Sequence, residues 1–370
     1  MKISGIISFL ESVAHPSLQE HYDNAGLITG DKNWECTGII CSLDATEDVI
    51  NEAISNHCNL IVAHHPIIFS GLKKINGKNY VEKAVITAIK NDIAIYAIHT
   101  NLDNVIKGVN GKIAATLGLQ NISVLLPKQN TLKKLFTFAP VDKAEQVRNA
   151  IFKAGGGHIG NYSECSFNAG GTGTFKAEEG THPYAGEIGK QHQEDEIKIE
   201  VIFPGWLENN IVMAVKESHP YEEVAYDVVN LTNVYQGVGS GIIGELPEAM
   251  TEMEFLRSVK KLFNLTVIRH TGLLNIRVKR VALCGGAGSF LVPSALAAGA
   301  DIYITADMKY HDFFDANDRL VIADIGHYES EQFTIDLLVE ILEQKFPNFA
   351  VLKTKVQTNP VRYFIGEKDY

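Results

Sequence analysis

The chain has 370 residues, of which 45% are hydrophobic and 21% are charged, the balance of a globular protein large enough for two or three domains. The formal net charge of −11 argues against a general nucleic-acid-binding role, because phosphate contacts need clustered Lys and Arg. A membrane span is also excluded, since no apolar run reaches the roughly eighteen residues that one needs. A small phosphorylated ligand held by a metal remains compatible with this charge.

The N-terminal stretch, MKISGIISFLESVAHPSLQE, places a Glu directly after a short apolar run. This pattern predicts an amphipathic helix rather than a signal peptide. The five cysteines stand apart along the chain, no CxxC occurs, and the count is odd. We therefore expect a reducing compartment, the cytoplasm, with no disulfide framework and no thiolate metal cluster.

Residues 37–126 alternate between short apolar runs and helical patterns. The apolar runs predict buried strands within 37–45, 59–69 and 93–104. The segments 46–57 and 81–92 predict helices, the first of them with Thr46 as its N-cap. Buried strands separated by helices indicate a parallel or mostly parallel sheet that is covered on both faces.

The composition changes near Pro127. Residues 155–190 are rich in Gly, Ser, Thr and Asn, and we interpret the Gly-rich part, 155–173, as turns. A half-buried strand at 196–204, a helix at 206–219 and an exposed edge strand at 221–231 follow. This region is typical of an antiparallel α+β module of about a hundred residues.

The buried-strand pattern returns after Pro247. Strands predicted within 279–290, 300–311 and 320–331 alternate with helices and match the earlier series, so that His64 aligns near Asp307. The fold class predicted is therefore α/β, with two related halves, 1–126 and 248–370, forming the core. Residues 127–247 form an inserted α+β domain.

Side chains that bind metals follow three of these strands. His64 and His65 follow the run 60–63, Asp103 follows the third strand, and His327 and Glu331 lie one helical turn apart. Ligands of open α/β sheets collect outside the carboxyl ends of strands. Each motif alone also fits a structural role: a packed His beside an exposed one, a turn-forming carboxylate, or a solvated helix start.

Taken together, three His and two carboxylates exceed the ligands of one catalytic metal, which keeps an open position. The count fits two divalent ions per chain, with a bridging carboxylate. Nitrogen and oxygen donors without thiolate suit Zn, Fe, Mn or Co, and the sequence does not choose among these metals. His99 is a candidate proton carrier, or equally a core histidine.

Two further motifs are less specific. The segment CGGAG at 284–288 lacks the spacing of a nucleotide fingerprint, which favours a tight turn over a phosphate cradle. Asp307, Lys309, Tyr310 and His311 occupy the repeat position opposite His64. These residues either line a pocket, with Lys309 or His311 contacting the substrate, or form a polar connection.

The motifs AHHPIIF, HTNLDN and GHYESE, in this order, resemble the Nif-three-like proteins, which are described as GTP cyclohydrolase type 2 homologues and as dinuclear-metal-centre hexameric proteins. The resemblance extends to NAGLITGD (24–31) and GADIYITADMKYH (299–311). It implies a core of two related α/β halves and a toroidal homohexamer whose metal sites face an inner cavity. The ligands that it implies are His64, His65, Asp103, His327 and Glu331.

The segment ESHPYEEVAYDVV (217–229) resembles the inserted domain of the longer bacterial members. That domain is similar to the ferredoxin-like CutA and PII-like trimeric regulators. The resemblance assigns no metal to His219, which we expect in an exposed loop.

Two functions fit these observations. The first is a metal-dependent hydrolase acting on a nucleotide or another small phosphorylated substrate. No Cys/His/Cys set of the kind used by zinc cyclohydrolases is visible, so GTP cyclohydrolysis is a label carried over from the family. The alternative is a non-enzymatic metal-handling or regulatory scaffold protein. Turnover of a nucleotide panel by the metal-loaded protein separates the two.

Overall fold

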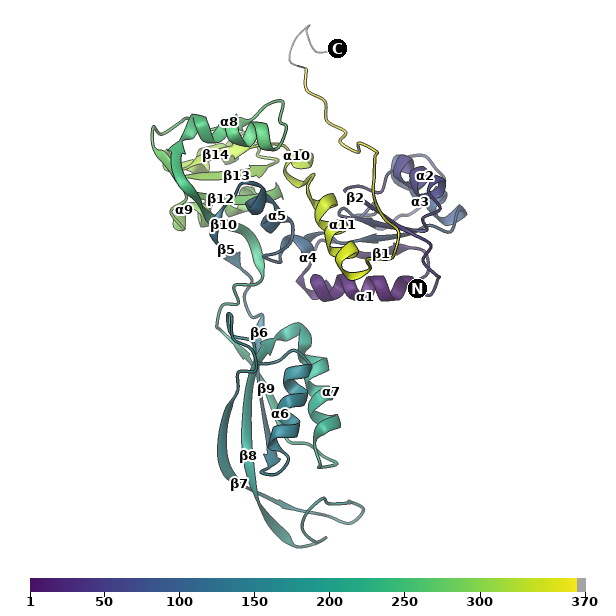
Figure 1. Cartoon of the computed structure of the whole chain (residues 1–370), viewed down its shortest axis with the longest axis vertical. Coiled ribbons are helices and arrows are strands. Elements are labelled where there is room, and N and C mark those ends of the chain that lie inside the picture. The colour runs from purple at the N-terminus through teal and green to yellow at the C-terminus, as the bar shows by residue number, and fades with distance from the viewer. Residues whose placement is uncertain (365–370) are drawn as a thin grey trace. The chain divides into compact units, whose positions relative to one another are not determined.

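The computed structural model describes residues 1–364 in two compact units (Figure 1). The core comprises residues 1–127 and the described residues from Gln236 onward, and the insert comprises Lys128–Tyr235. Within residues 1–364, no helix is both long and apolar enough to cross a membrane.

The first sheet of the core has the strand order β1-β4-β3-β2-β15. Its strands are β1 (Gly26–Thr29), β2 (Ile39–Ser42), β3 (Leu60–Ala63), β4 (Ala94–Ala97) and β15 (Val351–Lys353). All neighbours pair in parallel except β1, which runs antiparallel to β4. Every residue of β2, β3 and β4 is buried, as the continuous apolar runs predict for strands covered on both faces.

The second sheet has the order β11-β14-β13-β12-β10-β5. Its strands are β5 (Gln120–Pro127), β10 (Gly239–Thr251), β11 (Arg269–His270), β12 (Arg277–Ala287), β13 (Ile302–Ala306) and β14 (Val321–Asp324). The parallel run β14-β13-β12, with antiparallel β11 beside β14, repeats the order of β4-β3-β2 with β1. The pattern-based match between the two series of strands therefore has a counterpart in sheet topology.

Helices cover both faces of each sheet. Four of them pack with the inner faces of both sheets into one apolar cluster: α1 (Ile3–Val13), α5 (Val109–Thr116), α8 (Glu252–Leu262) and α11 (Thr334–Lys345). Helices α2 (Glu47–Ser55) and α3 (Tyr80–Lys90) cover the outer face of the first sheet, opposite α1 (Figure 1). Helix α9 (Val292–Ala297) and the 3₁₀ helix η4 (His311–Ala316) cover the outer face of the second.

Alternation along the strands divides these clusters, since Leu60 and Val62 face the shared cluster while Ile61 and Ala63 face α2 and α3. Thr46 caps α2 by accepting a hydrogen bond from the backbone N–H of Val49, as predicted. The short helices are η1 (Pro16–Leu18), α4 (Thr100–Asp103), η3 (Ser289–Leu291) and α10 (His327–Glu331).

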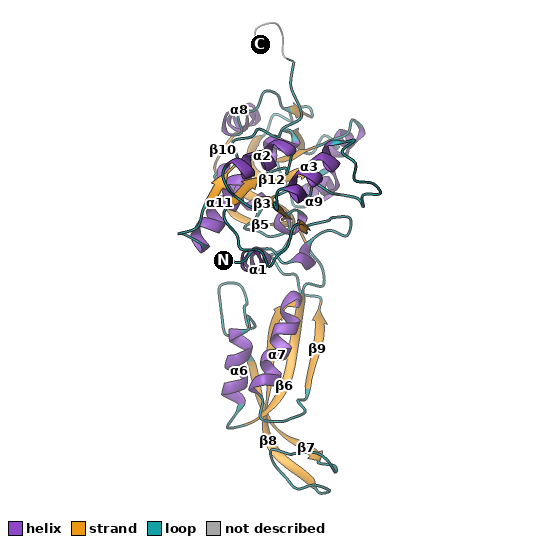
Figure 2. Cartoon of the chain, turned by 90° about the vertical axis from the view of Figure 1, so that its right-hand side faces the viewer, coloured by secondary structure: helices purple, strands orange, loops and turns teal. Residues whose placement is uncertain are grey.

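The insert is an antiparallel sheet of order β7-β8-β6-β9 with two helices on one face (Figure 2). In chain order its elements are β6 (Leu132–Pro140), α6 (Ala144–Lys153), β7 (Phe167–Lys176), β8 (Gln191–Pro204), η2 (Gly205–Leu207), α7 (Glu208–Ser218) and β9 (Tyr226–Leu231). The βαββαβ order with β6 and β8 central is the ferredoxin-like arrangement. Both views show the β7–β8 hairpin extending past α6 and α7.

Two sequence-based expectations need correction here. Residues 167–173, interpreted as turns, belong to β7, because that strand pairs with β8 from Phe167 to Lys176 despite its glycines. Residues 236–247, assigned from sequence to the inserted domain, lie with the core, because β10 pairs with both β5 and β12. Pro127 faces Gly239 in the β5–β10 ladder, so the insert lies in the connection between two adjacent strands.

Candidate metal centre

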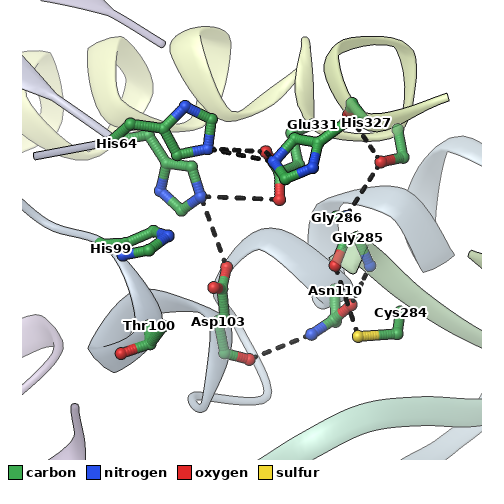
Figure 3. Close-up of polar contacts among 12 residues, drawn as sticks. His64, His99, Thr100, Asp103, Asn110, Cys284, Gly285, Gly286, His327 and Glu331 are labelled. Carbon is green, nitrogen blue, oxygen red and sulfur yellow. Dashed lines mark hydrogen bonds and ion pairs between the residues drawn. The ribbon is translucent and has the colours of Figure 1, made fainter. Parts of the chain in front are cut away.

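The five residues predicted as ligands meet at the carboxyl ends of the core strands (Figure 3). His64 and His65 directly follow β3, and Asp103 ends α4, which follows β4. His327 and Glu331 begin and end α10, so one helical turn places both on the same face. Gly326, with a φ of 90°, makes the turn that starts this helix.

Glu331 lies at the centre and is 3% exposed. Its Oε2 is 3.0 Å from His65 Nε2 and 3.1 Å from His327 Nε2. Its Oε1 is 3.9 Å from His64 Nε2, which in turn is 3.6 Å from Asp103 Oδ1. Three groups of side chains lie close enough to hold an ion, and two of them share Glu331, one with His65 and His327 and the other with His64 and Asp103. The third group comprises His64, His65 and His99.

Acceptors on the far side of the imidazole rings fix their orientation. In each ring Nδ1 lies against an oxygen: Ile98 O for His64 (2.9 Å), Asp44 Oδ1 for His65 (2.9 Å), Asp307 Oδ2 for His327 (2.7 Å) and Asp23 Oδ1 for His99 (2.8 Å). Because these oxygens accept, Nδ1 donates, and Nε2 is left to face the cluster. Such outer hydrogen bonds are typical of metal-binding histidines.

The charges of the cluster are strongly coupled. Burial by itself raises the pKa of Glu331, but hydrogen bonds with His327 and His65, together with the nearby His64, outweigh it and hold that pKa well below its usual range. Burial lowers the pKa of both His65 and His327, yet their hydrogen bonds to carboxylates raise these pKa values to about 9 and about 11. In the ligand-free chain, protons on both rings therefore offset the charge of Glu331.

The unpartnered atoms test whether a cation fits. His64 Nε2 and Asp103 Oδ1 are buried and have no hydrogen-bond partner among residues 1–364. Burial and the neighbouring Glu331 charge raise the pKa of Asp103 to about 7. Two ligands of one tetrahedral zinc ion stand about 3.4 Å apart, because each lies about 2.0–2.1 Å from the ion. The 3.6 Å between these two atoms is close to that spacing, so the residues fit a divalent cation.

A pair of glycines near the end of β12 packs directly against Glu331. Gly286 has a φ of 62°, and a Cβ at this position would lie 2.4 Å from Glu331 Oε1. Its N–H donates to Ser330 Oγ, and the N–H of Gly285 donates to Asn110 Oδ1 (Figure 3). The expectation of a tight turn at CGGAG was wrong, because residues 284–287 belong to β12, whose register against β13 shifts between Leu283 and Ala287. This irregular strand end lets the backbone approach the central carboxylate.

Sequence reasoning missed the outer carboxylates. Asp44 ends the segment SLD after β2, and Asp23 precedes the segment NAGLITGD, but neither has a spacing that connects it to a histidine. Asp307, expected either in the lining of a pocket or in a polar connection, does line the cavity, and its contact with His327 was not foreseen. Lys309 and His311 lie outside the cavity lining, and His311 begins η4 beside Tyr310, so the polar-connection interpretation holds for them.

The expectation for His219 was wrong. Its side chain is buried, Nε2–H donates to the carbonyl of Phe138, and Nδ1 accepts from the N–H of Tyr221. The residue caps the C-terminal end of α7 and packs against the Tyr221 ring, which removes it from solvent.

A cavity of about 650 Å³ opens onto the cluster. The exposed aromatic residues of its lining are Tyr22, Phe69, Phe290 and Tyr363. Arg269 is the one Lys or Arg among the described residues that line it, and it is paired with Asp324. Recognition of an anionic group here therefore depends on the cluster itself, while the aromatic rings offer surfaces for a planar group.

Fold and site together define a class: a mixed α/β protein whose strand ends converge on His and Glu side chains that could hold a metal ion. The chain belongs to the Duf34/NIF3 (NGG1p interacting factor 3) family, whose model matches residues 1–360. It is 42% identical over 371 residues to the GTP cyclohydrolase 1 type 2 homolog of Halalkalibacterium halodurans, covering 98% of this chain and 100% of that one.

Two solved structures are similar along their whole length. A Bacillus cereus protein related to NIF3 matches with a TM-score of 0.88 and 40% identity, and a Staphylococcus aureus protein matches with a TM-score of 0.77 and 30% identity. Each comparison covers 98% of this chain and 99% of the other. The similarity therefore includes the core and the insert.

Proposed function

We propose that this protein is a dinuclear metal-dependent hydrolase acting on a nucleotide or another small phosphorylated substrate. The observation that carries the proposal is the division of the Glu331 carboxylate, whose two oxygens face two different ligand groups. The curated relatives are named GTP cyclohydrolase 1 type 2 homolog, which supports a nucleotide as the substrate class.

Each ligand group has a distinct environment. His64, Asp103 and Glu331 would hold the inner ion, since His64 is fully buried. His65, His327 and Glu331 would hold the outer one, next to the cavity. When bound, a pair of divalent ions supplies Lewis-acid polarisation of a phosphoryl oxygen and lowers the pKa of water.

His99 is suited to carry a proton in this reaction. Its Nδ1–H donates to Asp23, which also accepts from the backbone and hydroxyl of Thr100. Burial raises the pKa of Asp23, but the hydrogen bonds from His99 and Thr100 lower it to about 2, so this anchor stays charged at neutral pH. His99 Nε2 is left facing His64 and His65, where it can accept a proton from the attacking water.

The cavity suits a planar ring with a single anionic group. Tyr22, Phe69 and Phe290 can stack on a nucleobase, whereas Arg269 is already neutralised by Asp324. A long polyphosphate would meet several carboxylates of the lining, including Asp44, and no further Lys or Arg among the described lining residues. Nucleoside monophosphates and small phosphoesters are therefore the first substrates to test.

The experiment is turnover of nucleotides and phosphoesters by the chain loaded in turn with Zn²⁺, Mn²⁺, Fe²⁺ or Co²⁺. We expect hydrolysis that requires metal and falls by about 100-fold or more in His99→Asn, the usual size of a general-base contribution. A chain that holds two metals and turns over no member of the panel would reject the hydrolase and favour the metal-handling alternative.

For the insert, we propose a CutA/PII-like regulatory role. Its βαββαβ order and its ferredoxin-like sheet support this assignment, as does a second cavity, of about 720 Å³, beside β7. Strand β9 lies at an edge of the sheet, where pairing with another subunit would cover its open hydrogen-bonding groups.

We further propose a homohexamer that works in the cytoplasm. The number six comes from the family resemblance, and closed symmetry is the usual outcome for soluble homo-oligomers. All five cysteines, which lie within the described residues, are unpaired, as suits a reducing compartment. Light scattering at micromolar concentration should give six times the mass of the chain, and a monomer would reject the assembly.

A further inference from the structure

The C-terminal segment contacts both halves of the metal centre. This segment, residues 354–364, is called the strap; it follows β15 and forms neither helix nor strand. At its start the N–H of Thr354 donates to the carbonyl of Cys41 and the Thr354 hydroxyl donates to Glu52 on α2. Further along the strap, the side chains of Thr358 and Asn359 contact residues beside the proposed ligands.

The first of these contacts reaches His65 through one carboxylate. The Thr358 hydroxyl donates to Asp44 Oδ2 at 2.5 Å, and the other oxygen of Asp44 accepts from His65 Nδ1 at 2.9 Å. Asp44 is therefore fixed from both sides. Without the Thr358 hydroxyl its carboxylate could rotate, and the His65 ring would lose its fixed orientation.

The second contact reaches α10. Asn359, which is 7% exposed, donates from Nδ2 to Glu329 Oε1 at 3.0 Å, while its own Oδ1 accepts from the N–H of Val361. Glu329 lies between His327 and Glu331 on a helix of five residues. A single turn is not stable alone, because one hydrogen-bonded turn does not offset the cost of nucleating a helix. Contacts from outside α10 must therefore hold His327 and Glu331 in place.

Part of the strap also lines the cavity beside the cluster. Asn359, Pro360, Val361 and Tyr363 all line it, next to Asp44 and Glu329. The strap thus joins the ligand-bearing parts of both core halves and also closes one side of the space in which a substrate would lie.

We propose that the strap is a clamp for the metal centre, in which Thr358 and Asn359 are positioning residues. Thr358 sets the orientation of His65, and Asn359 sets the position of α10 with His327 and Glu331. This inference rests on the proposed dinuclear centre, but it concerns metal affinity and not hydrolysis.

The chain offers a matched control, because Thr354 and Thr358 each donate a hydroxyl to a carboxylate from the same strap, and only Thr358 is connected to a ligand. The test compares Thr358→Val, Asn359→Ala and Thr354→Val in the full chain. Zn²⁺ affinity is measured by competition with a chromophoric chelator, and the visible spectrum of bound Co²⁺ reports ligand geometry.

Thr358→Val should weaken one Zn²⁺ equivalent by about tenfold, the lower end of what outer-contact substitutions cost, and should shift the Co²⁺ spectrum. Asn359→Ala should weaken both equivalents, because α10 carries the shared Glu331. Thr354→Val should leave both unchanged. Equal affinities in Thr358→Val and Thr354→Val, with two ions bound by the unmodified chain, would overturn the clamp alone. An unmodified chain that binds no Zn²⁺ would overturn the clamp and the dinuclear centre together.

Discussion

At the scale of single residues, Glu331 occupies a buried position that needs compensation of its charge. It is a buried carboxylate whose two oxygens face different histidines, His65 and His327 on one side and His64 on the other. A buried charge is costly unless it is paired. The surrounding donors hold it ionised, and that ionised form is the one that binds metals.

This arrangement predicts unequal effects of removing ligands. Glu331→Ala should weaken both Zn²⁺ equivalents, because each ligand group contains one of its oxygens. His327→Ala should remove only the outer equivalent. Metal analysis after reloading distinguishes the two, with His311→Ala as the control, since His311 lies outside the cavity lining. Loss of a single equivalent in Glu331→Ala would contradict a shared carboxylate.

At the scale of an element, the irregular end of β12 depends on one glycine. Gly286→Ala should disrupt metal binding, because a Cβ there would occupy the space of Glu331 Oε1. Gly299→Ala is the matched control: its φ of 68° is similar, but nothing lies within 4 Å of the added Cβ. Both changes should lower the free energy of unfolding by about 1–2 kcal/mol through left-handed strain. Equal Zn²⁺ affinity in the two variants would contradict the clash.

In the insert, the stability of the contact between α7 and the sheet should depend on pH through His219. Burial lowers the pKa of His219 below its ordinary value of 6.5, although the bond to Phe138 opposes the shift. The unfolded insert therefore binds more protons in acid. The contribution of His219 to stability is full above about pH 6.5 and is lost as the pH falls through the folded-state pKa.

Urea unfolding of the intact chain measures this effect. The chain has two tryptophans, so Trp34→Phe leaves Trp206 of the insert as the only one. In that background, His219→Gln should remove part of the loss of stability below pH 6.5. A pH dependence identical to that of the histidine form would show that His219 is not responsible.

At the scale of the whole molecule, the insert should be separable from the metal centre. Its two ends connect to Pro127 and Gln236, and Pro127 pairs with Gly239 in the core sheet. Deleting residues 128–235 and joining the ends through two glycines should leave a folded core that binds the same number of Zn²⁺ ions, since all five proposed ligands lie outside the deletion. Circular dichroism and metal analysis check this, and aggregation or loss of metal would count against independent folding.

Sequence patterns predicted the buried strands and the residues that follow them. The runs at 60–63 and 94–97 are continuous and apolar, which is a local property of strands covered on both faces. Glycine-rich β7 has no apolar run of this kind. It is a strand because its backbone pairs with β8, and its own side chains do not predict that pairing. The same holds for residues 236–247, whose place in the core depends on β5 and β12 rather than on their own pattern.

The amino-acid sequence by itself determined the types of the proposed ligands, their order and their positions at strand ends, because these follow from short-range periodicity. Only the tertiary structure decided how the proposed ligands combine. His65 and Glu331 are 266 residues apart, and the partners of the imidazole Nδ1 atoms, such as Asp44, come from other elements. Contacts of this kind arise when the two core halves and the strap pack together, and no local pattern encodes them.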